Sequence, residues 1–277
     1  MFMFAGNSLL CRIALRHTAI DAASFTTIRI VSGALMLALI VGLRRGGQVG
    51  RGSWASAVAL VAYAAAFSFA YVALPAGAGA LILFGAVQAT MIGHGILSGE
   101  RMLKSQLVGL LIALAGLIGL FLPGLSAPPL AGSALMLGAG ISWGIYSLRG
   151  RGAGDPTRVT AGNFLRAVPI AALISVIAYK HGSLDRPGIL AAVASGGVTS
   201  GIGYAIWYAA LPALKSTNAA TVQLSVPVIA AIGGIALLSE PLTARLALSS
   251  VAILGGIALV LSAKGAAVRA REAVRMD

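Results

Sequence analysis

Long runs of apolar residues, separated by short stretches with Gly, Pro or charged residues, dominate the chain. A helix that crosses a bilayer takes about 20 apolar residues, and ten runs approach that length. Their average spacing of about 28 residues leaves room for one crossing and a short turn. The pattern predicts an all-α membrane protein with ten transmembrane helices, over approximately residues 2–15, 24–43, 54–73, 77–97, 105–122, 130–148, 160–179, 188–210, 217–238 and 244–263.

Composition supports this class. Of 277 residues, 58% are hydrophobic and only 10% are charged, whereas a soluble domain carries about 25% charged residues. This excludes an ordinary soluble enzyme and leaves no room for a nucleotide-binding domain. Met1 leads directly into apolar residues without a basic segment, so we expect a first helix here and no cleavable signal peptide.

Basic residues give a formal charge of +13, and most of them stand between the apolar runs. Lys and Arg are retained on the cytoplasmic side of a membrane, so their distribution predicts orientation. We expect both termini in the cytoplasm of a bacterial inner membrane, with the lipid surface and not nucleic acid facing this charge. The side assigned to the cytoplasm holds Arg44, Arg45, Arg51, Arg101, Lys104, Arg149, Arg151, Arg158, Lys215, Lys264, Arg269, Arg271 and Arg275, and the opposite side holds Arg12, Arg16, Lys180, Arg186 and Arg245.

Few residues are suited to hold a metal or a cofactor. Cys11 is the single cysteine, which excludes an internal disulfide and a cysteine metal cluster. The three histidines, His17, His94 and His181, are too far apart in sequence for a ligand motif. We therefore expect no metal and no cofactor, only a small-molecule substrate and lipid, and we leave monomer and homodimer open.

The chain also resembles itself. Residues 71–75 (YVALP) recur as residues 208–212 (YAALP), and the same offset pairs Arg29 with Arg166. The matches keep their order and include rare charged and proline positions, which favours a true repeat over chance similarity of apolar helices.

This repeat divides the chain into residues 1–125 and 126–277, with five predicted helices in each half. Because five is odd, the second half enters the bilayer upside down. Inverted repeats of this kind form a site near the membrane midplane and expose it alternately to the two sides by rocking. The sequence therefore predicts two inverted five-helix repeats and a transport function.

Several motifs are similar to those of a known family. They are Ser98-Gly99-Glu100-Arg101, its counterpart Ser239-Glu240-Pro241, the glycines that follow each, Trp143-Gly144, and the two arginines Arg29 and Arg166. Together they resemble the drug/metabolite transporter superfamily, specifically its ten-helix EamA-type carriers, with the YddG-type amino-acid exporters as the nearest likeness. The resemblance implies a central cavity built by the first four helices of each half, with the fifth and tenth helices outside. One departure is Phe4-Ala5-Gly6-Asn7, where the family often has Trp-Gly.

Arg29 and Arg166 stand inside predicted helices, where an arginine is costly unless it has partners. They are candidates for gripping a substrate carboxylate. We favour a structural role, in which each side chain extends to its own membrane surface, because the inverted topology places the two near opposite faces.

Aromatic residues spaced four apart share one face of the third and of the eighth predicted helix. Such faces are suited to line a cavity, although an aromatic belt at the membrane surface explains Tyr71 and Tyr208 equally well. Buried amides must find hydrogen-bond partners, either as structural contacts between helices or at the site. We predict a cavity lined by Asn7, Tyr63, Phe67, Tyr71, Gln88, His94, Trp143, Tyr146, Tyr204 and Tyr208.

Glu100 and Glu240 each precede an apolar helix, whose positive end stabilises a carboxylate. We favour this capping role over proton coupling. His94 is the one titratable group that we place deep in the membrane, and we favour a structural hydrogen bond for it. The sequence thus favours facilitated movement or exchange over proton coupling.

Our leading hypothesis is a secondary carrier that exports small metabolites by alternating access, with amino acids, including aromatic and neutral ones, as favoured cargo. Efflux of drugs or other metabolites is the alternative within the same family. An integral membrane enzyme acting on lipid-linked substrates needs clustered acids or a nucleophile with a base, and the sequence has no such motif. A channel or scaffold stays open, because inverted repeats also occur in channels.

Overall fold

The computed structural model describes residues 1–44, 48–99, 103–122, 127–150, 154–210 and 222–276, without the side chains of residues 181, 208, 209 and 263–276. All regular structure in this part of the chain is helical. The longer helices are α1 (Phe2–His17), α2 (Ala22–Gly42), α3 (Trp54–Tyr71), α4 (Ala76–Leu97), α5 (Lys104–Phe121), α6 (Leu130–Arg149), α7 (Pro156–Ile177), α11 (Ser225–Leu238) and α12 (Ala244–Met276). The shorter ones are η1 (Tyr179–His181), α8 (Arg186–Val193), η2 (Ala194–Ile202) and α9 (Gly203–Ala210).

Seven helical stretches in the described ranges are long and apolar enough to cross a membrane. Six lie in α2, α3, α4, α5, α7 and α12, and the seventh runs continuously through α8 and η2 into α9. The predicted all-α membrane protein is confirmed. Helices α1, α6 and α11 match three further predicted runs but are shorter or less apolar, so the number ten stays a prediction.

Side-chain oxygens begin several helices. Asp21, Asp155 and Asp185 accept hydrogen bonds from the first free amides of α2, α7 and α8, and Ser53 does so for α3. These amides have no partner inside the helix, so the acceptor compensates them. Polar residues between the apolar runs thus set where these helices start.

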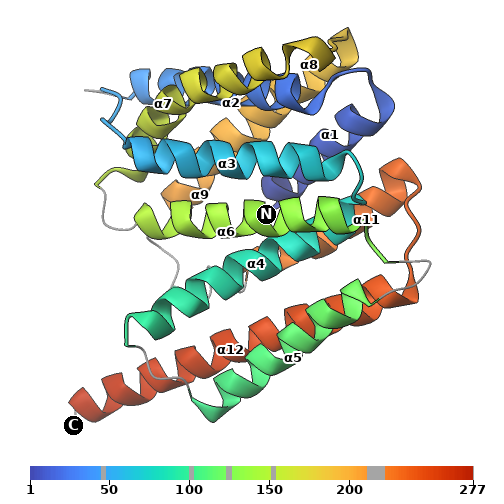
Figure 1. The fold of residues 1–277 in the computed structure, drawn as a ribbon. Helices are drawn as coiled ribbons and strands as arrows, with labels where there is room; N and C mark the ends of the chain where they lie inside the picture. Colours follow the sequence, from blue (N-terminus) through green and yellow to red (C-terminus); the bar gives the residue numbers. More distant parts are fainter. Residues whose placement is uncertain (45–47, 100–102, 123–126, 151–153, 211–221, 277) are drawn as a thin grey trace.

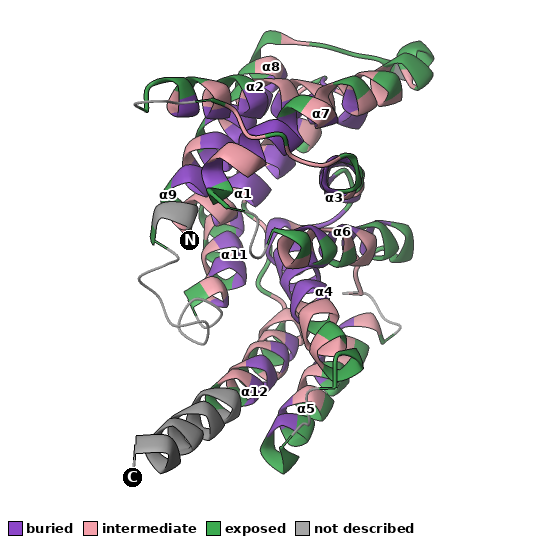
Figure 2. Cartoon of the chain, turned by 90° about the vertical axis from the view of Figure 1, so that its left-hand side faces the viewer, coloured by how far each residue is buried: buried purple, intermediate pink, exposed green. Residues whose placement is uncertain are grey.

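The helices form a layered bundle with one pair set apart (Figure 1). Helix α2 packs on α7, α3 packs on α6, and α4 packs on α6 and α11. Helices α5 and α12 pair closely and lie at one edge of the molecule in both views, where much of their surface is exposed (Figure 2). Buried residues concentrate in the main bundle, which contains the candidate site (Figure 2).

Small residues set how closely helices approach. A side chain added at Gly109 would come within 2.6 Å of the Gly256 carbonyl oxygen, and one at Gly140 would lie 2.5 Å from Ala86. Only glycine allows such backbone contacts between helices in lipid. The exposed apolar side chains on the outside of these helices, such as Leu248 and Val251, suit a lipid environment.

The predicted eighth run is not a uniform α-helix. Its central part, η2, is a π-helix, in which backbone bonds reach one residue further than in an α-helix. Such segments are frequent at functional sites. Here η2 contains Gly196, Gly197 and Gly201 and packs closely on α2. Periodicity alone did not reveal it, because both helix types bury similar apolar positions.

Candidate functional site

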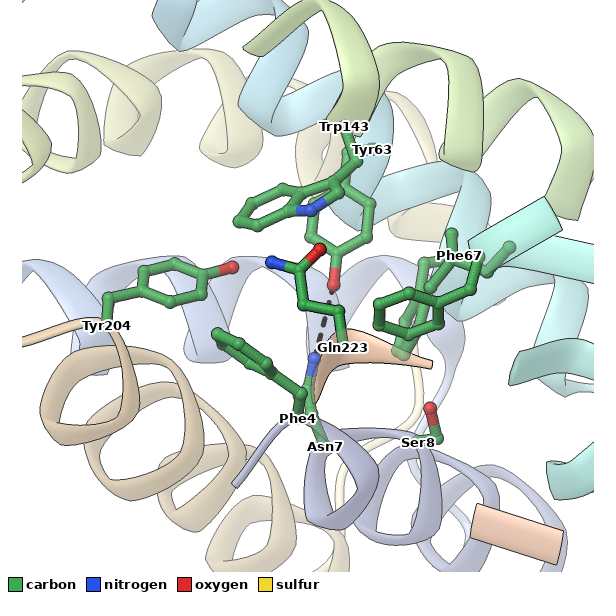
Figure 3. Close-up of a pocket in the computed structure, with 10 residues that line it drawn as sticks. Phe4, Asn7, Ser8, Tyr63, Phe67, Trp143, Tyr204 and Gln223 are labelled. Carbon is green, nitrogen blue, oxygen red and sulfur yellow. Dashed lines mark hydrogen bonds between the residues drawn. The ribbon is translucent and has the colours of Figure 1, made fainter. Parts of the chain in front are cut away.

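A cavity lies where α1, α3, α4, α6 and α9 meet the start of the segment leading into α11. Its lining is mostly aromatic, with a polar wall contributed chiefly by α1 (Figure 3). The lining residues are Phe4, Asn7, Ser8, Tyr63, Phe67, Leu83, Phe84, Trp143, Tyr204 and Gln223.

Aromatic rings pack around Trp143. Its ring centre lies 4.9 Å from that of Tyr63 and 5.3 Å from that of Tyr204, against which it stacks. Phe4 adds a ring 5.8 Å from Tyr204. The Tyr204 hydroxyl and the Gln223 amide both point toward the middle of the cavity (Figure 3). Such a wall offers apolar surface and a few polar groups that orient a ligand.

The cavity is small in this conformation. Its volume of about 20 Å³ holds about one ordered water. Ligand pockets for small molecules are typically several hundred Å³. The cavity is therefore too small for a metabolite, and helices must move apart before one enters.

A hydrogen-bond network runs behind the polar wall. The Tyr63 hydroxyl accepts a hydrogen bond from Arg29 Nη2 at 3.0 Å and lies 3.3 Å from Asn7 Nδ2. The side-chain oxygen of Asn7, Oδ1, accepts a hydrogen bond from Ser195 Oγ at 2.5 Å. Arg29 Nε lies 3.5 Å from Ser200 Oγ. The network thus joins three consecutive helices, α1, α2 and α3, to the π-helix η2 from far along the chain.

The π-helix brings these hydroxyls to the network. Adding a Cβ at Gly196 would place it 2.1 Å from the Arg29 carbonyl oxygen, so only glycine permits this approach to α2. The close contact carries Ser200 to Arg29 and Ser195 to Asn7. Gly196 therefore has a packing role that directly serves the site.

Arg29 is buried at 2% exposure, and its hydrogen bonds go to side chains inside the bundle and not to loop carbonyl oxygens. Its guanidinium carbon lies 5.2 Å from the ring centre of Tyr63 and 4.9 Å from that of Phe67, where ring faces stabilise a cation. Nη1 has no hydrogen-bond partner within the described ranges, and none of the ion pairs found there involves Arg29. The surface-reaching role that we favoured for this residue does not match its position.

One end of the site is closed by a buried ion pair. Arg12 Nε lies 3.2 Å from Glu240 Oε1, and Arg12 Nη1 donates to the carbonyl oxygens of Tyr71 and Val72 at 2.8 and 3.0 Å. The second Glu240 oxygen accepts from the Ala76 amide at 2.8 Å. These bonds tie α1 and the turn between α3 and α4 to the segment before α12.

Two predictions need correction at this end. We counted Arg12 among the basic residues on the side opposite the cytoplasm, but its side chain is 4% exposed and lies inside the bundle, paired with Glu240. Glu240 does meet a helix N-terminus, yet the helix is α4 and not the α12 that follows it. The chain folds back so that a residue from the second half compensates the amides of the first, and sequence proximity does not reveal this. Glu100 lies outside the described residues.

The opposite end of α3 is held by different contacts. The Ser53 amide donates to Asn163 Oδ1 at 2.8 Å, and the Gly50 amide donates to the Arg158 carbonyl oxygen at 3.1 Å. Arg44 lies 3.6 Å from Asp155 in a partly exposed ion pair. Tyr63 and Phe67 thus lie along α3 between two sets of contacts that hold the bundle closed at its two ends.

Of the predicted lining residues, Asn7, Tyr63, Phe67, Trp143 and Tyr204 line one cavity. Two predicted tyrosines lie apart from it. Tyr71 is fully buried and its hydroxyl donates to the Ala76 carbonyl oxygen at 3.3 Å, which supports the closed end. Tyr146 stacks on Trp143, but its hydroxyl accepts from Asn163 Nδ2 at 3.3 Å, in a separate small cavity.

The remaining candidates are also outside the lining. Gln88 is buried in α4, and its Nε2 has no hydrogen-bond partner in the part of the chain that the structure describes. His94 is exposed in the last turn of α4. Arg166 is half-buried, with its guanidinium carbon 5.7 Å from the ring centre of Trp54. The Tyr208 side chain lies outside the described residues.

Sequence reasoning missed several residues of the site. Ser8, Leu83, Phe84 and Gln223 line the cavity, and Ser195 and Ser200 support it. The signal for α1 was present, since Phe4, Asn7 and Ser8 fall on one helix face at spacings of three and four. The serines of η2 carried no such signal, because their register depends on the π-helix.

The fold and the site together define a multi-span membrane protein with a closed aromatic cavity between its helices. The EamA-like transporter family model matches residues 130–262, so this part of the chain is an EamA family domain. This places the protein in the drug/metabolite transporter superfamily. The apolar helices and the similarity to bacterial exporters support a location in the inner membrane.

The chain is 57% identical over 246 residues to an uncharacterized protein of Pseudomonas aeruginosa, covering 88% of this chain and 86% of that protein. It is 36% identical to the threonine/homoserine exporter RhtA of Escherichia coli (strain K12) over 120 residues, which is 41% of this chain and 39% of the exporter. A probable amino-acid metabolite efflux pump of Salmonella typhimurium is 27% identical over 198 residues, 64% of this chain and 66% of the pump. One crystal structure matches the fold with a TM-score of 0.66 at 20% identity, over 94% of this chain and 96% of that chain.

Proposed function

We propose that the protein is a secondary carrier that exports amino acids from the cell by alternating access. The observation that carries this proposal is the small aromatic cavity, to which helices from both predicted halves contribute. We interpret a small, partly polar cavity between helices as the occluded form of a carrier, whereas a channel requires a continuous path.

We propose that residues 1–125 and 126–277 are two inverted five-helix repeats. Packing supports this: each of α2, α4 and α5 contacts its presumed counterpart, α7, α11 and α12. Helix α3 packs on α6, and in the corresponding position α8 and η2 pack on α1. An approximate twofold relation predicts this exchange of partners. The Lys and Arg distribution supports cytoplasmic placement of both termini.

Alternating access then requires that each closed end open in turn. The Arg12–Glu240 contacts join helices of different halves at one end, and the Ser53–Asn163 contacts do so at the other. Opening one end while the other stays closed would expose the cavity to a single side of the membrane. The proposed cycle is therefore a rocking of the two halves about the aromatic cavity.

Amino acids are the proposed cargo because the similar proteins include a threonine/homoserine exporter and a probable amino-acid metabolite efflux pump. The aromatic lining suits neutral and aromatic side chains. We propose movement without proton coupling, or exchange, because the structure gives no candidate for a proton carrier among the acidic residues whose side chains it describes. Asp21, Asp155 and Asp185 cap helices, and Glu240 pairs with Arg12. His94 is exposed.

Counterflow in liposomes that contain only this protein tests the proposal. We expect saturable uptake of labelled threonine that internal threonine stimulates, and no response to an imposed pH gradient. Trp143→Ala should change the amino-acid profile, while Trp54→Ala, an exposed tryptophan, should leave it unchanged. Unsaturable flux would indicate a channel, and a pH-driven flux lost on replacing His94 would contradict uncoupled transport.

A further inference from the structure

The Tyr63 hydroxyl is unusually well supplied with donors. Arg29 Nη2 donates to it at 3.0 Å, and Asn7 Nδ2 does so at 3.3 Å. The orientation of the Asn7 amide follows from its other end, where Oδ1 accepts from Ser195 Oγ. The amide nitrogen is therefore the atom that faces Tyr63.

A hydroxyl group has two acceptor positions and one hydrogen to donate. Arg29 can only donate, so it necessarily takes one acceptor position, and Asn7 takes the second. The hydroxyl hydrogen of Tyr63 has neither of these neighbours as an acceptor. Since Tyr63 lines the cavity, this hydrogen is available to a ligand inside it.

The charge behind this hydroxyl lacks a counterion. Arg29 is buried, one of its terminal nitrogens has no hydrogen-bond partner among the described residues, and no described carboxylate forms an ion pair with it. A buried charge without a counterion is costly. A guanidinium that donates to a hydroxyl also polarises it, which makes the hydroxyl a stronger donor.

We propose that Tyr63 donates a hydrogen bond to the carboxylate of the substrate, with Arg29 and Asn7 as positioning residues behind it. This rests on the proposed function and deepens it, because it assigns recognition to the acidic end of the amino acid. None of the described residues that line the cavity is acidic. The ammonium end therefore contacts ring faces, which attract cations more weakly than a carboxylate would.

The test compares threonine with its amide, threoninamide, which keeps the ammonium group and side chain but lacks the negative charge. Binding is followed by tryptophan fluorescence, since Trp143 lines the cavity, and transport is followed in parallel by counterflow. We expect the wild-type protein to prefer threonine. Tyr63→Phe should reduce that preference roughly tenfold to hundredfold, the effect expected for a hydrogen bond to a charged group.

Two further variants separate recognition from folding. Tyr146→Phe removes a buried hydroxyl outside this cavity, so the preference should stay at the wild-type value. Asn7→Asp has nearly the same shape, but its carboxylate accepts the Tyr63 hydrogen and offsets the Arg29 charge. It should weaken threonine binding about tenfold or more and leave threoninamide binding nearly unchanged.

Equal binding of threonine and threoninamide by the wild-type protein, or an unchanged preference in Tyr63→Phe, would overturn the inference. Selective binding of threonine without counterflow would contradict the carrier function and support the carboxylate site. Counterflow of both compounds at equal rates would support the carrier function and contradict the carboxylate site.

Discussion

The two halves of the chain carry arginines at matching positions, and their surroundings differ. Arg12 and Arg149, like Arg29 and Arg166, are separated by 137 residues. Arg12 and Arg29 are both buried: Arg12 forms an ion pair with Glu240, and Arg29 lies behind the cavity wall, where it donates to Tyr63. Arg149 is exposed with Nε 3.3 Å from Ser56 Oγ, and Arg166 lies over the exposed Trp54. A shared position in the proposed repeat therefore does not fix a shared role, because the role depends on which helices pack around the arginine.

The largest expected difference is in stability, between substitutions of Arg12 and of Arg149. Arg12→Gln leaves Glu240 buried without its charge partner, which typically costs about 3–5 kcal/mol. Arg149→Gln changes an exposed residue and should cost less than about 0.5 kcal/mol. Thermal unfolding in detergent measures both. The double variant Arg12→Gln, Glu240→Gln should recover part of the loss, and an equal effect of the two single changes would contradict the comparison.

The second pair should differ in transport. Arg29→Gln removes the charge behind Tyr63 and should lower threonine transport efficiency about tenfold to hundredfold. Arg166→Gln loses only a contact at a half-exposed ring and should stay within about twofold. Counterflow rates, corrected for the amount of folded protein in the liposomes, give the ratio. Similar losses in both variants would mean that Arg29 has no special relation to the cavity.

Two neighbouring glycines, Gly196 and Gly197, test whether the close packing of η2 on α2 is what holds Arg29 in its buried position. A Cβ at Gly196 would lie 2.0 Å from Ser32 Oγ, whereas one at Gly197 would have its nearest neighbour, Met36 Cε, at 3.7 Å. Gly196→Ala should therefore destabilise the protein by about 1–3 kcal/mol by overpacking, and Gly197→Ala should have little effect. Unfolding temperatures of the two variants test this. If Gly196→Ala unfolds like the wild type, the close contact of η2 with α2 is not what holds Arg29 in place.

The smallest effect concerns the start of α2, the helix that carries Arg29. Partial burial alone would raise the pKa of Asp21, but hydrogen bonds from Ser24 and from the backbone amides of Ser183 and Ala23 outweigh burial and lower this pKa below its ordinary value. The carboxylate therefore stabilises the fold above its unfolded-state pKa, and this contribution is lost as the pH falls through the lowered pKa.

Asp21→Ala should cost about 1 kcal/mol at neutral pH. Asp21→Asn keeps a capping oxygen but cannot titrate, so it should be less destabilising and should flatten the acid side of the stability curve. Unfolding measured at several pH values distinguishes the two variants. An unchanged pH dependence in Asp21→Asn would show that other groups control acid stability.

Most of the fold follows from the sequence, because the bilayer fixes the length of a spanning helix and the apolar runs show that length directly. Tyr63, Phe67, Trp143 and Tyr204 were found for a similar reason, since spacing on a helix face is a local property. The partners of Arg29 were not found. The hydrogen bond to Tyr63 depends on how α2 packs against α3. The contact with Ser200 depends on the π-helix, more than 160 residues further along the chain, and on a glycine contact that no local pattern encodes.

The same limit explains the errors at the closed end. The sequence indicates that Glu240 stands before a helix, and a carboxylate there suits a helix N-terminus. Which N-terminus it reaches is decided by the packing of α4 on α11, which brings the Ala76 amide closer than the start of α12. Arg12 was counted with the basic residues that flank the apolar runs, whereas here Glu240 compensates its charge inside the bundle.

Access to the cavity from the two sides of the membrane tests the central claim most directly. The chain has one buried cysteine, so Ser8→Cys in a Cys11→Ala background places a single thiol at the cavity lining. A membrane-impermeant thiol reagent, applied to one side or the other of oriented vesicles, should label this residue from both sides, and threonine should slow the labelling. Labelling from one side only, at a rate that threonine does not change, would contradict a cavity that opens alternately to both sides.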